Sequence, residues 1–132
     1  MKQENTKITA LTAYDASFAK LFDEQGIDVL LIGDSLGMVL KGDDDTLSVT
    51  LEEIAYHTCS VKKGVERAFV VADMPFMSYQ LSIDEGFRNA GRIMKETSAG
   101  GVKLEGGARL ADTIKKITDV TIRKQCFFEF MA

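Results

Sequence analysis

The sequence predicts an α/β fold with a parallel sheet, because short apolar segments alternate with segments of helical periodicity. The segments DVLLIG at 28–33 and FVVAD at 69–73 are almost continuously apolar, which is typical of parallel strands covered on both faces. Further strands are expected at 7–13 and 101–107, and a glycine-containing polar loop at 34–48. Four such strands fit an open doubly wound sheet or half of a (β/α)₈ barrel. A whole barrel needs about 250 residues, and this chain has 132.

The first two helices are predicted from apolar spacing and from signals at their ends. Residues 17–25 place three apolar side chains on one face, and Gly26 follows as a stop. Thr50 with Glu53 has the spacing of a capping box, which opens a helix that closes at Gly64. Both helices connect predicted strands, as a βαβ arrangement requires.

The second half of the chain repeats this pattern. Ser82 with Glu85 predicts another capping box, for a helix that stops near residues 100–101. A further helix is expected at 109–117, and residues 119–122 are a possible start of a fifth strand. No linker or low-complexity segment divides the chain, so we expect one domain.

Composition excludes several classes of function. The chain has 16 Lys and Arg against 20 Asp and Glu, with no basic cluster, so we expect no nucleic-acid partner. Its two cysteines, Cys59 and Cys126, form no CxxC pattern and are expected to be reduced thiols of a cytoplasmic protein. No signal peptide is predicted at the N-terminus, and no apolar run approaches the roughly 18–20 residues of a membrane span. We therefore expect no membrane partner.

Three acids stand at the carboxyl ends of predicted strands: Asp34 in IGDSLG, Asp73 in VVADMPF and Glu105 in VKLEGG. Parallel strands bring their carboxyl ends to one edge of the sheet, where α/β folds bind their ligands. Carboxylate oxygens are ligands that Mg²⁺ prefers. The sequence therefore predicts a Mg²⁺ site, provided that the three side chains reach one ion.

Several motifs together carry a resemblance to a known family. They occur in order between about residues 9 and 122: TAYD at 12–15, IGDSLGMV at 32–39, DTLSVTLEEIAYHT at 45–58, VVADMPFMSY at 70–79 and VKLEGG at 102–107. In these segments the chain closely resembles the N-terminal half of the ketopantoate hydroxymethyltransferases. The resemblance implies a (β/α)₈ barrel of the phosphoenolpyruvate mutase type, of which this chain would supply about four βα units. It also implies a homodecamer that acts in pantothenate biosynthesis.

The same resemblance implies a reaction and its site residues. The family transfers a hydroxymethyl group from the co-substrate 5,10-methylenetetrahydrofolate to the 2-oxo acid 3-methyl-2-oxobutanoate, giving 2-dehydropantoate. By position, Asp34, Asp73 and Glu105 would hold Mg²⁺, while Asp34, Ser35, Asp73 and Lys103 would contact the 2-oxo acid. These residue types suit the chemistry, since a cation and a lysine stabilise the negative charge that develops on a 2-oxo acid.

The C-terminal residues depart from the family pattern. Residues 1–122 follow it, whereas the tail RKQCFFEFMA at 123–132 keeps none of it. The family's general base, a glutamate on a later strand, has no counterpart here, and a positioned base is worth about 10² to 10⁴ in rate. We therefore expect this chain alone to be inactive or nearly so.

Two residue groups and two other functions have to be weighed against this interpretation. The single histidine, His57, lies in mid-helix and is expected to be packed or exposed rather than catalytic; the acidic run 43–45 is expected to be solvated. The chain could instead be a related Mg²⁺-dependent lyase or mutase of another 2-oxo acid. It could also be an inactive truncated or frameshifted product, whose open half-barrel would tend to self-associate.

Overall fold

The structure, a computed structural model, describes residues 7–120 and 128–130. Five strands form one parallel sheet in the order β1-β2-β3-β4-β5, so each strand pairs with its neighbour in the sequence. The strands are β1 (Ala10–Thr12), β2 (Val29–Ile32), β3 (Phe69–Asp73), β4 (Gly101–Glu105) and β5 (Phe128–Phe130). The four predicted strands are confirmed. All their carboxyl ends meet at one edge of the sheet.

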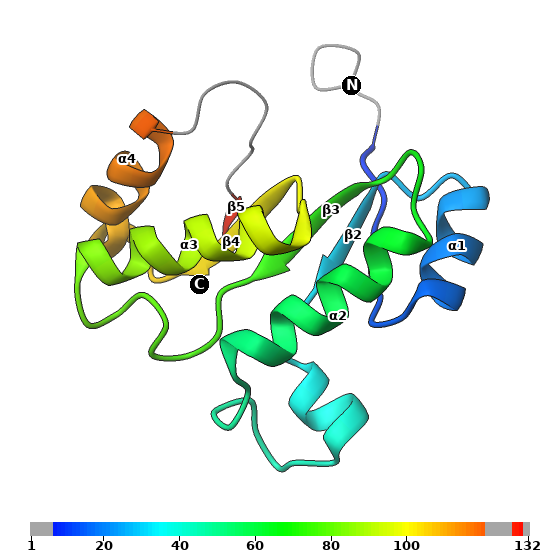
Figure 1. The fold of residues 1–132 in the computed structure, drawn as a ribbon, viewed down its shortest axis with the longest axis horizontal. Coiled ribbons are helices and arrows are strands. Elements are labelled where there is room, and N and C mark those ends of the chain that lie inside the picture. The colour runs from blue at the N-terminus through cyan, green and yellow to red at the C-terminus, as the bar shows by residue number, and fades with distance from the viewer. Residues whose placement is uncertain (1–6, 121–127, 131–132) are drawn as a thin grey trace.

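The helices form a single row along the sheet (Figure 1). α1 packs on α2, α2 on α3, and α3 on α4. Consecutive strand order combined with one row of helices is the arrangement of part of a (β/α)₈ barrel rather than of a doubly wound sheet. The helices are α1 (Ala16–Glu24), α2 (Leu51–Lys63), α3 (Ile83–Thr97) and α4 (Ala111–Val120).

Side-chain caps fix where the helices begin. The capping box of α2 is confirmed: the Thr50 hydroxyl accepts from the Glu53 N–H, and the Glu53 carboxylate accepts from the Thr50 N–H at 2.8 Å. At α3, Ser82 accepts from the Glu85 N–H at 3.1 Å. Asp15 caps α1 through two N–H groups. These local signals lie entirely in the sequence, which is why the helix starts were predictable.

Three predictions of local structure were wrong. Residues Gly37–Lys41, expected in a loop, form one turn of π-helix that ends at Gly42, where φ is 77°. α3 ends at Thr97, before the expected glycines, because Ser98 takes the left-handed conformation. Residues 119–120, expected to begin a fifth strand, belong to the helix α4. This helix buries Thr113 and Ile117, which lie four residues apart on one face, so the helical spacing continues up to this point. Residues 121–122 lie outside the described part of the chain, and the fifth strand comes later, at β5.

The core lies between the sheet and its row of helices. Its fully buried members include Leu30, Ile32, Val70, Ile54 and Ile93. By contrast, all three residues of β1 are exposed, and Phe18 on α1 is 57% exposed. Within residues 7–120 and 128–130, the sheet is therefore covered by its own helices on one side and has β1 as an edge strand with no further strand beside it. Among the described helices, none is long and apolar enough to cross a membrane.

Candidate functional site

The three predicted acids line one cavity at the carboxyl edge of the sheet. Asp34 follows β2, while Asp73 and Glu105 are the last residues of β3 and β4. The cavity has a volume of about 240 Å³. Its other lining residues come from the loops after β2 and β3: Thr46, Leu47, Met74, Phe76, Tyr79 and Gln80. The predicted convergence of the three acids is thus found in the structure.

Lys103 connects two of the acids. Its Nζ lies 2.6 Å from Asp73 Oδ2 and 2.6 Å from Glu105 Oε1, so one ammonium donates to both carboxylates. Asp73 and Lys103 are 4% and 7% exposed, and they pair because Asp73 and Lys103 are register partners on neighbouring strands. The sheet itself therefore brings the lysine to the acids.

Burial dominates the electrostatics of Asp73 but not those of Lys103. It raises the pKa of Asp73 from 3.8 to about 6, although the hydrogen bond and charge of Lys103 act in the opposite direction; the charges of Asp34 and Glu105 raise it further. Burial alone would lower the pKa of Lys103, but its hydrogen bonds to the two carboxylates outweigh burial and raise that pKa. The lysine therefore stays charged, while Asp73 holds a negative charge that its surroundings only partly balance.

Ser35 lies beside this group and is held by a residue of the segment that follows β1. Its Oγ is 2.7 Å from the Tyr14 hydroxyl. A Cβ added to Gly33 would lie 2.9 Å from Ser35 Oγ and 3.9 Å from Asp73 Oδ2, so the bare glycine leaves a space between these two side chains. The structure thus places four predicted residues in or beside the cavity and Ser35 across Gly33 from Asp73.

Most of the chain matches one family model. The family of this model is described as ketopantoate hydroxymethyltransferase, and the match covers residues 1–125. The chain belongs to the ketopantoate hydroxymethyltransferase family. The family model thus supports the predicted family.

Curated relatives agree with this family. The chain is 57% identical over 121 residues to 3-methyl-2-oxobutanoate hydroxymethyltransferase of Clostridium beijerinckii, covering 92% of this chain and 44% of the relative. It is 65% identical over 114 residues to the protein of the same name from Alteromonas mediterranea, covering 86% of this chain and 42% of the relative. The chain therefore spans less than half the length of the relatives that it matches.

Solved structures show the same fold. Phosphonopyruvate hydrolase, in a complex with oxalate and Mg²⁺, superposes with a TM-score of 0.74 at 11% identity, covering 92% of this chain and 46% of that one. 2,3-Dimethylmalate lyase, a member of the PEP mutase/isocitrate lyase superfamily, superposes with a TM-score of 0.67 at 15% identity, covering 89% of this chain and 44% of that one. The chain therefore has the fold of part of these structures, and the predicted half of a (β/α)₈ barrel is confirmed.

The predicted family site includes two tyrosines to which the sequence assigned no role. Tyr14 holds Ser35, and Tyr79 lines the cavity with the acids. Both lie in motifs that carried the resemblance, TAYD and VVADMPFMSY. Tyr14 directly follows the predicted strand 7–13, which signalled a place near the site but not its partner, whereas Tyr79 lies six residues beyond the predicted strand 69–73. His57 behaves as expected: its Nδ1 donates to the Tyr14 carbonyl at 2.8 Å, so it is a packing residue of α2.

The acids fit a divalent cation by donor type. All three offer carboxylate oxygens to one cavity, and Gly33 leaves space next to Asp73. As the side chains stand, however, no three acidic, histidine or cysteine side chains within the described residues are arranged to hold an ion. Lys103 bridges two of the acids instead. The assignment of the three acids as metal ligands therefore stays a prediction.

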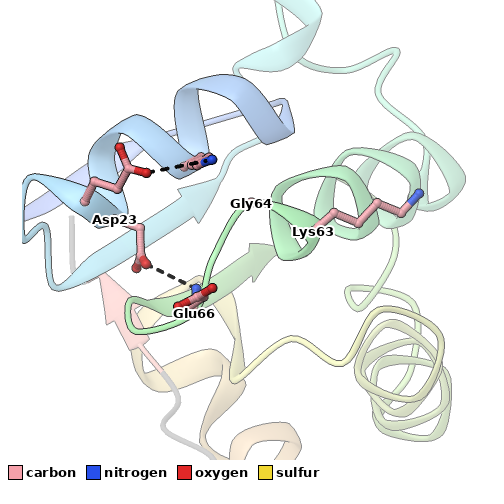
Figure 2. A pocket seen from close by; sticks show the side chains of 6 residues that line it. Asp23, Lys63, Gly64 and Glu66 are labelled. Carbon is pink, nitrogen blue, oxygen red and sulfur yellow. Dashed lines mark hydrogen bonds and ion pairs between the residues drawn. The ribbon is translucent and has the colours of Figure 1, made fainter.

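A second cavity of about 240 Å³ lies at the opposite edge of the sheet (Figure 2). Asp23 of α1 accepts backbone N–H groups of the segment that leads into β3, at 3.1 Å from Glu66 and 2.6 Å from Ala68. A Cβ on Gly64 would lie 2.2 Å from the Ala16 carbonyl, so only glycine allows α1 and α2 to approach here. The six lining residues are Lys20, Asp23, Glu24, Lys63, Gly64 and Glu66. These contacts join structural elements, and the edge is the one that stabilises barrels rather than the one that binds ligands.

Proposed function

We propose that this chain provides the 2-oxo acid site for hydroxymethyl transfer from 5,10-methylenetetrahydrofolate to 3-methyl-2-oxobutanoate, which gives 2-dehydropantoate in pantothenate biosynthesis. The observation that carries the proposal is the meeting of Asp34, Asp73, Lys103 and Glu105 at the carboxyl edge of the sheet. The names of the curated relatives support the identity of the reaction.

Lys103 and Ser35 are the groups that bind and orient the substrate in this proposal. Lys103 is buried and charged, so its ammonium is largely shielded from solvent and can stabilise negative charge on the substrate. Ser35 offers a hydroxyl that Tyr14 already holds in place, and it donates a hydrogen bond to the substrate carboxylate. Both groups are prepared before the substrate arrives.

Asp34, Asp73 and Glu105 would hold Mg²⁺. When bound, the ion polarises the oxygens of the 2-oxo acid as a Lewis acid. Phosphonopyruvate hydrolase, which has this fold, was solved with oxalate and Mg²⁺, and this supports the choice of metal. Asp73 contributes a buried charge that a cation would balance.

The proposal extends to the assembly and its place in the cell. We propose a homodecamer, as the family implies, in the cytoplasm, with the folate co-substrate and the 2-oxo acid as its small-molecule partners. The open β1 edge supports association with further polypeptide, because an unpaired parallel strand is stable only when it is covered.

Two measurements test the proposal. Calorimetry with 3-methyl-2-oxobutanoate in Mg²⁺ buffer should show binding to the wild-type chain and little or none to Lys103→Met. A turnover assay with methylenetetrahydrofolate should give little 2-dehydropantoate from the chain alone. Adding the part of the Clostridium beijerinckii relative that this chain does not cover should raise turnover. Absence of 2-oxo acid binding by the wild-type chain would contradict the proposal, and full turnover by the chain alone would contradict the need for a base from elsewhere.

A further inference from the structure

The Tyr79 hydroxyl makes two hydrogen bonds to the backbone of a single residue, Glu105. It donates to the Glu105 carbonyl at 2.9 Å and accepts from the Glu105 N–H at 3.1 Å. The pairing of β3 with β4 ends at Asp73 and Lys103, so Tyr79 takes over the hydrogen bonding of β4 two residues beyond the end of that ladder. It thereby fixes the carboxyl end of β4 to the loop that follows β3.

Tyr79 is itself held firmly. It is 5% exposed, and the preceding Ser78 is anchored twice: its carbonyl accepts from Asn89 of α3 at 2.7 Å, and its hydroxyl donates to the Pro75 carbonyl at 2.6 Å. α3 approaches closely at Gly86, where an added Cβ would lie 3.1 Å from Tyr79 Cβ. The phenol is therefore a rigid support rather than a mobile side chain.

Glu105 needs such a support. Its side chain is 60% exposed, and the two residues after it are Gly106 and Gly107, with φ of 155° and 59°. Glu105 pairs with Phe130 on the β5 side, but the ladder with β3 has already ended, and two following glycines leave the β3 side of Glu105 few local restraints. The hydrogen bonds from Tyr79 supply that restraint, and they hold Glu105 where its carboxylate meets Lys103 beside Asp73.

We propose that Tyr79 is a positioning residue of the cation site, which keeps the Glu105 carboxylate directed at the space shared with Asp34 and Asp73. This rests on the proposed function, because it takes Glu105 as a ligand of the cation. Both hydrogen bonds of the Tyr79 hydroxyl go to the backbone of Glu105, so Tyr79 acts through that residue. Residues that support metal ligands in this way typically change metal affinity 10- to 100-fold when they are altered.

The test compares Tyr79→Phe, which removes only the hydroxyl, with Tyr56→Phe as a matched control. Tyr56 is 72% exposed on α2 and lies outside the cavity. Mn²⁺ alone is the probe, titrated by electron paramagnetic resonance well below the thermal midpoint of each variant. Amide hydrogen exchange at Glu105 reports on the backbone independently of any metal. We expect faster exchange at Glu105 and a Mn²⁺ dissociation constant at least 10-fold higher for Tyr79→Phe, with neither change for Tyr56→Phe.

A purely structural role would lower the thermal midpoint but leave the Mn²⁺ affinity of the folded variant unchanged, and that result would overturn the proposal. Unchanged exchange at Glu105 would overturn it too. If wild-type chain binds no Mn²⁺, the metal part of the proposed function fails together with this inference, whereas a failure of the inference alone leaves wild-type binding intact. If Tyr79→Phe does not fold, the wild-type chain still decides: Mg²⁺ should shift the Glu105 amide and Tyr79 ring resonances, and no shift would overturn the proposal.

Discussion

Replacing Asp73 by asparagine should change how the stability of the chain depends on pH. Burial raises the pKa of Asp73 from 3.8 to about 6, in spite of the neighbouring Lys103. The folded chain therefore keeps this proton up to a higher pH than the unfolded chain does. In metal-free buffer, the free energy of unfolding should fall as pH rises through the window from about 4 to about 6 and stay low above it.

The size of this effect follows from the shift. One pKa unit corresponds to about 1.4 kcal/mol, so a rise from 3.8 to about 6 corresponds to about 3 kcal/mol. No reduction for solvent screening is needed, since Asp73 is 4% exposed. Asparagine does not titrate, so the difference in unfolding free energy between variant and wild type should grow by about this amount across the window.

Urea unfolding in EDTA at closely spaced pH values between 4 and 7.5 measures this difference. Asp73→Asn also loses the charged hydrogen bond to Lys103, which changes its stability at every pH. The test is therefore how the difference in unfolding free energy changes with pH, and not its absolute size. Asp44→Asn, the same change at an exposed loop residue, is the control and should run parallel to the wild type. If the unfolding free energy of Asp73→Asn also runs parallel to that of the wild type across this pH range, burial does not raise the pKa of Asp73 and the reasoning is refuted.

Three further changes have separate expected outcomes. Thr50→Ala removes the capping box with Glu53 and should cost about 1 kcal/mol in urea unfolding; a loss within error would contradict the cap. Partial burial alone would raise the pKa of Asp23, but three backbone N–H donors and a nearby arginine together lower it. Asp23→Asn should therefore reduce the free energy of unfolding at neutral pH. The difference from the wild type should vanish once pH falls below the pKa of Asp23 in the folded state. A constant difference down to pH 2 would contradict this. Tyr14→Phe frees the Ser35 hydroxyl and should weaken 3-methyl-2-oxobutanoate binding several-fold by calorimetry without altering Mn²⁺ affinity; equal losses of both would instead indicate a general collapse.

Much of the fold was predictable because its signals are local. The apolar runs that became β2 and β3 and the cap at Thr50 depend on neighbouring residues only. The π-helix at 37–41 could not be predicted, because it depends on contacts from outside the turn: Val49 and the Asp45 carbonyl lie close to Gly37. The late β5 depends on pairing with β4, a contact between distant segments.

For the site as well, features that follow from local sequence could be predicted, whereas features that depend on contacts between distant residues could not. The convergence of Asp34, Asp73 and Glu105 could be predicted, because parallel strands place their carboxyl ends together. The bridge by Lys103 could not, since it depends on the register of β3 against β4, which pairs Lys103 with Asp73. The roles of Tyr14 and Tyr79 could not either, because each acts across more than twenty residues of sequence.

The charges of the cavity lead to a last prediction. Three carboxylates face one ammonium there, so the metal-free site carries an excess of negative charge in which burial already raises the pKa of Asp73. A 2-oxo acid is itself an anion, and adding it to this site is unfavourable unless a cation is present. Calorimetry with 3-methyl-2-oxobutanoate should therefore show binding to the wild-type chain in Mg²⁺ and at least 10-fold weaker binding in EDTA. Asp34→Asn has one carboxylate fewer, so it should bind 3-methyl-2-oxobutanoate less strongly than the wild type in Mg²⁺ and no less strongly in EDTA. The ratio of its affinities in Mg²⁺ and EDTA should therefore be smaller than that of the wild type. Equal affinity in Mg²⁺ and EDTA would mean that Lys103 alone balances the substrate and that the acids serve another purpose.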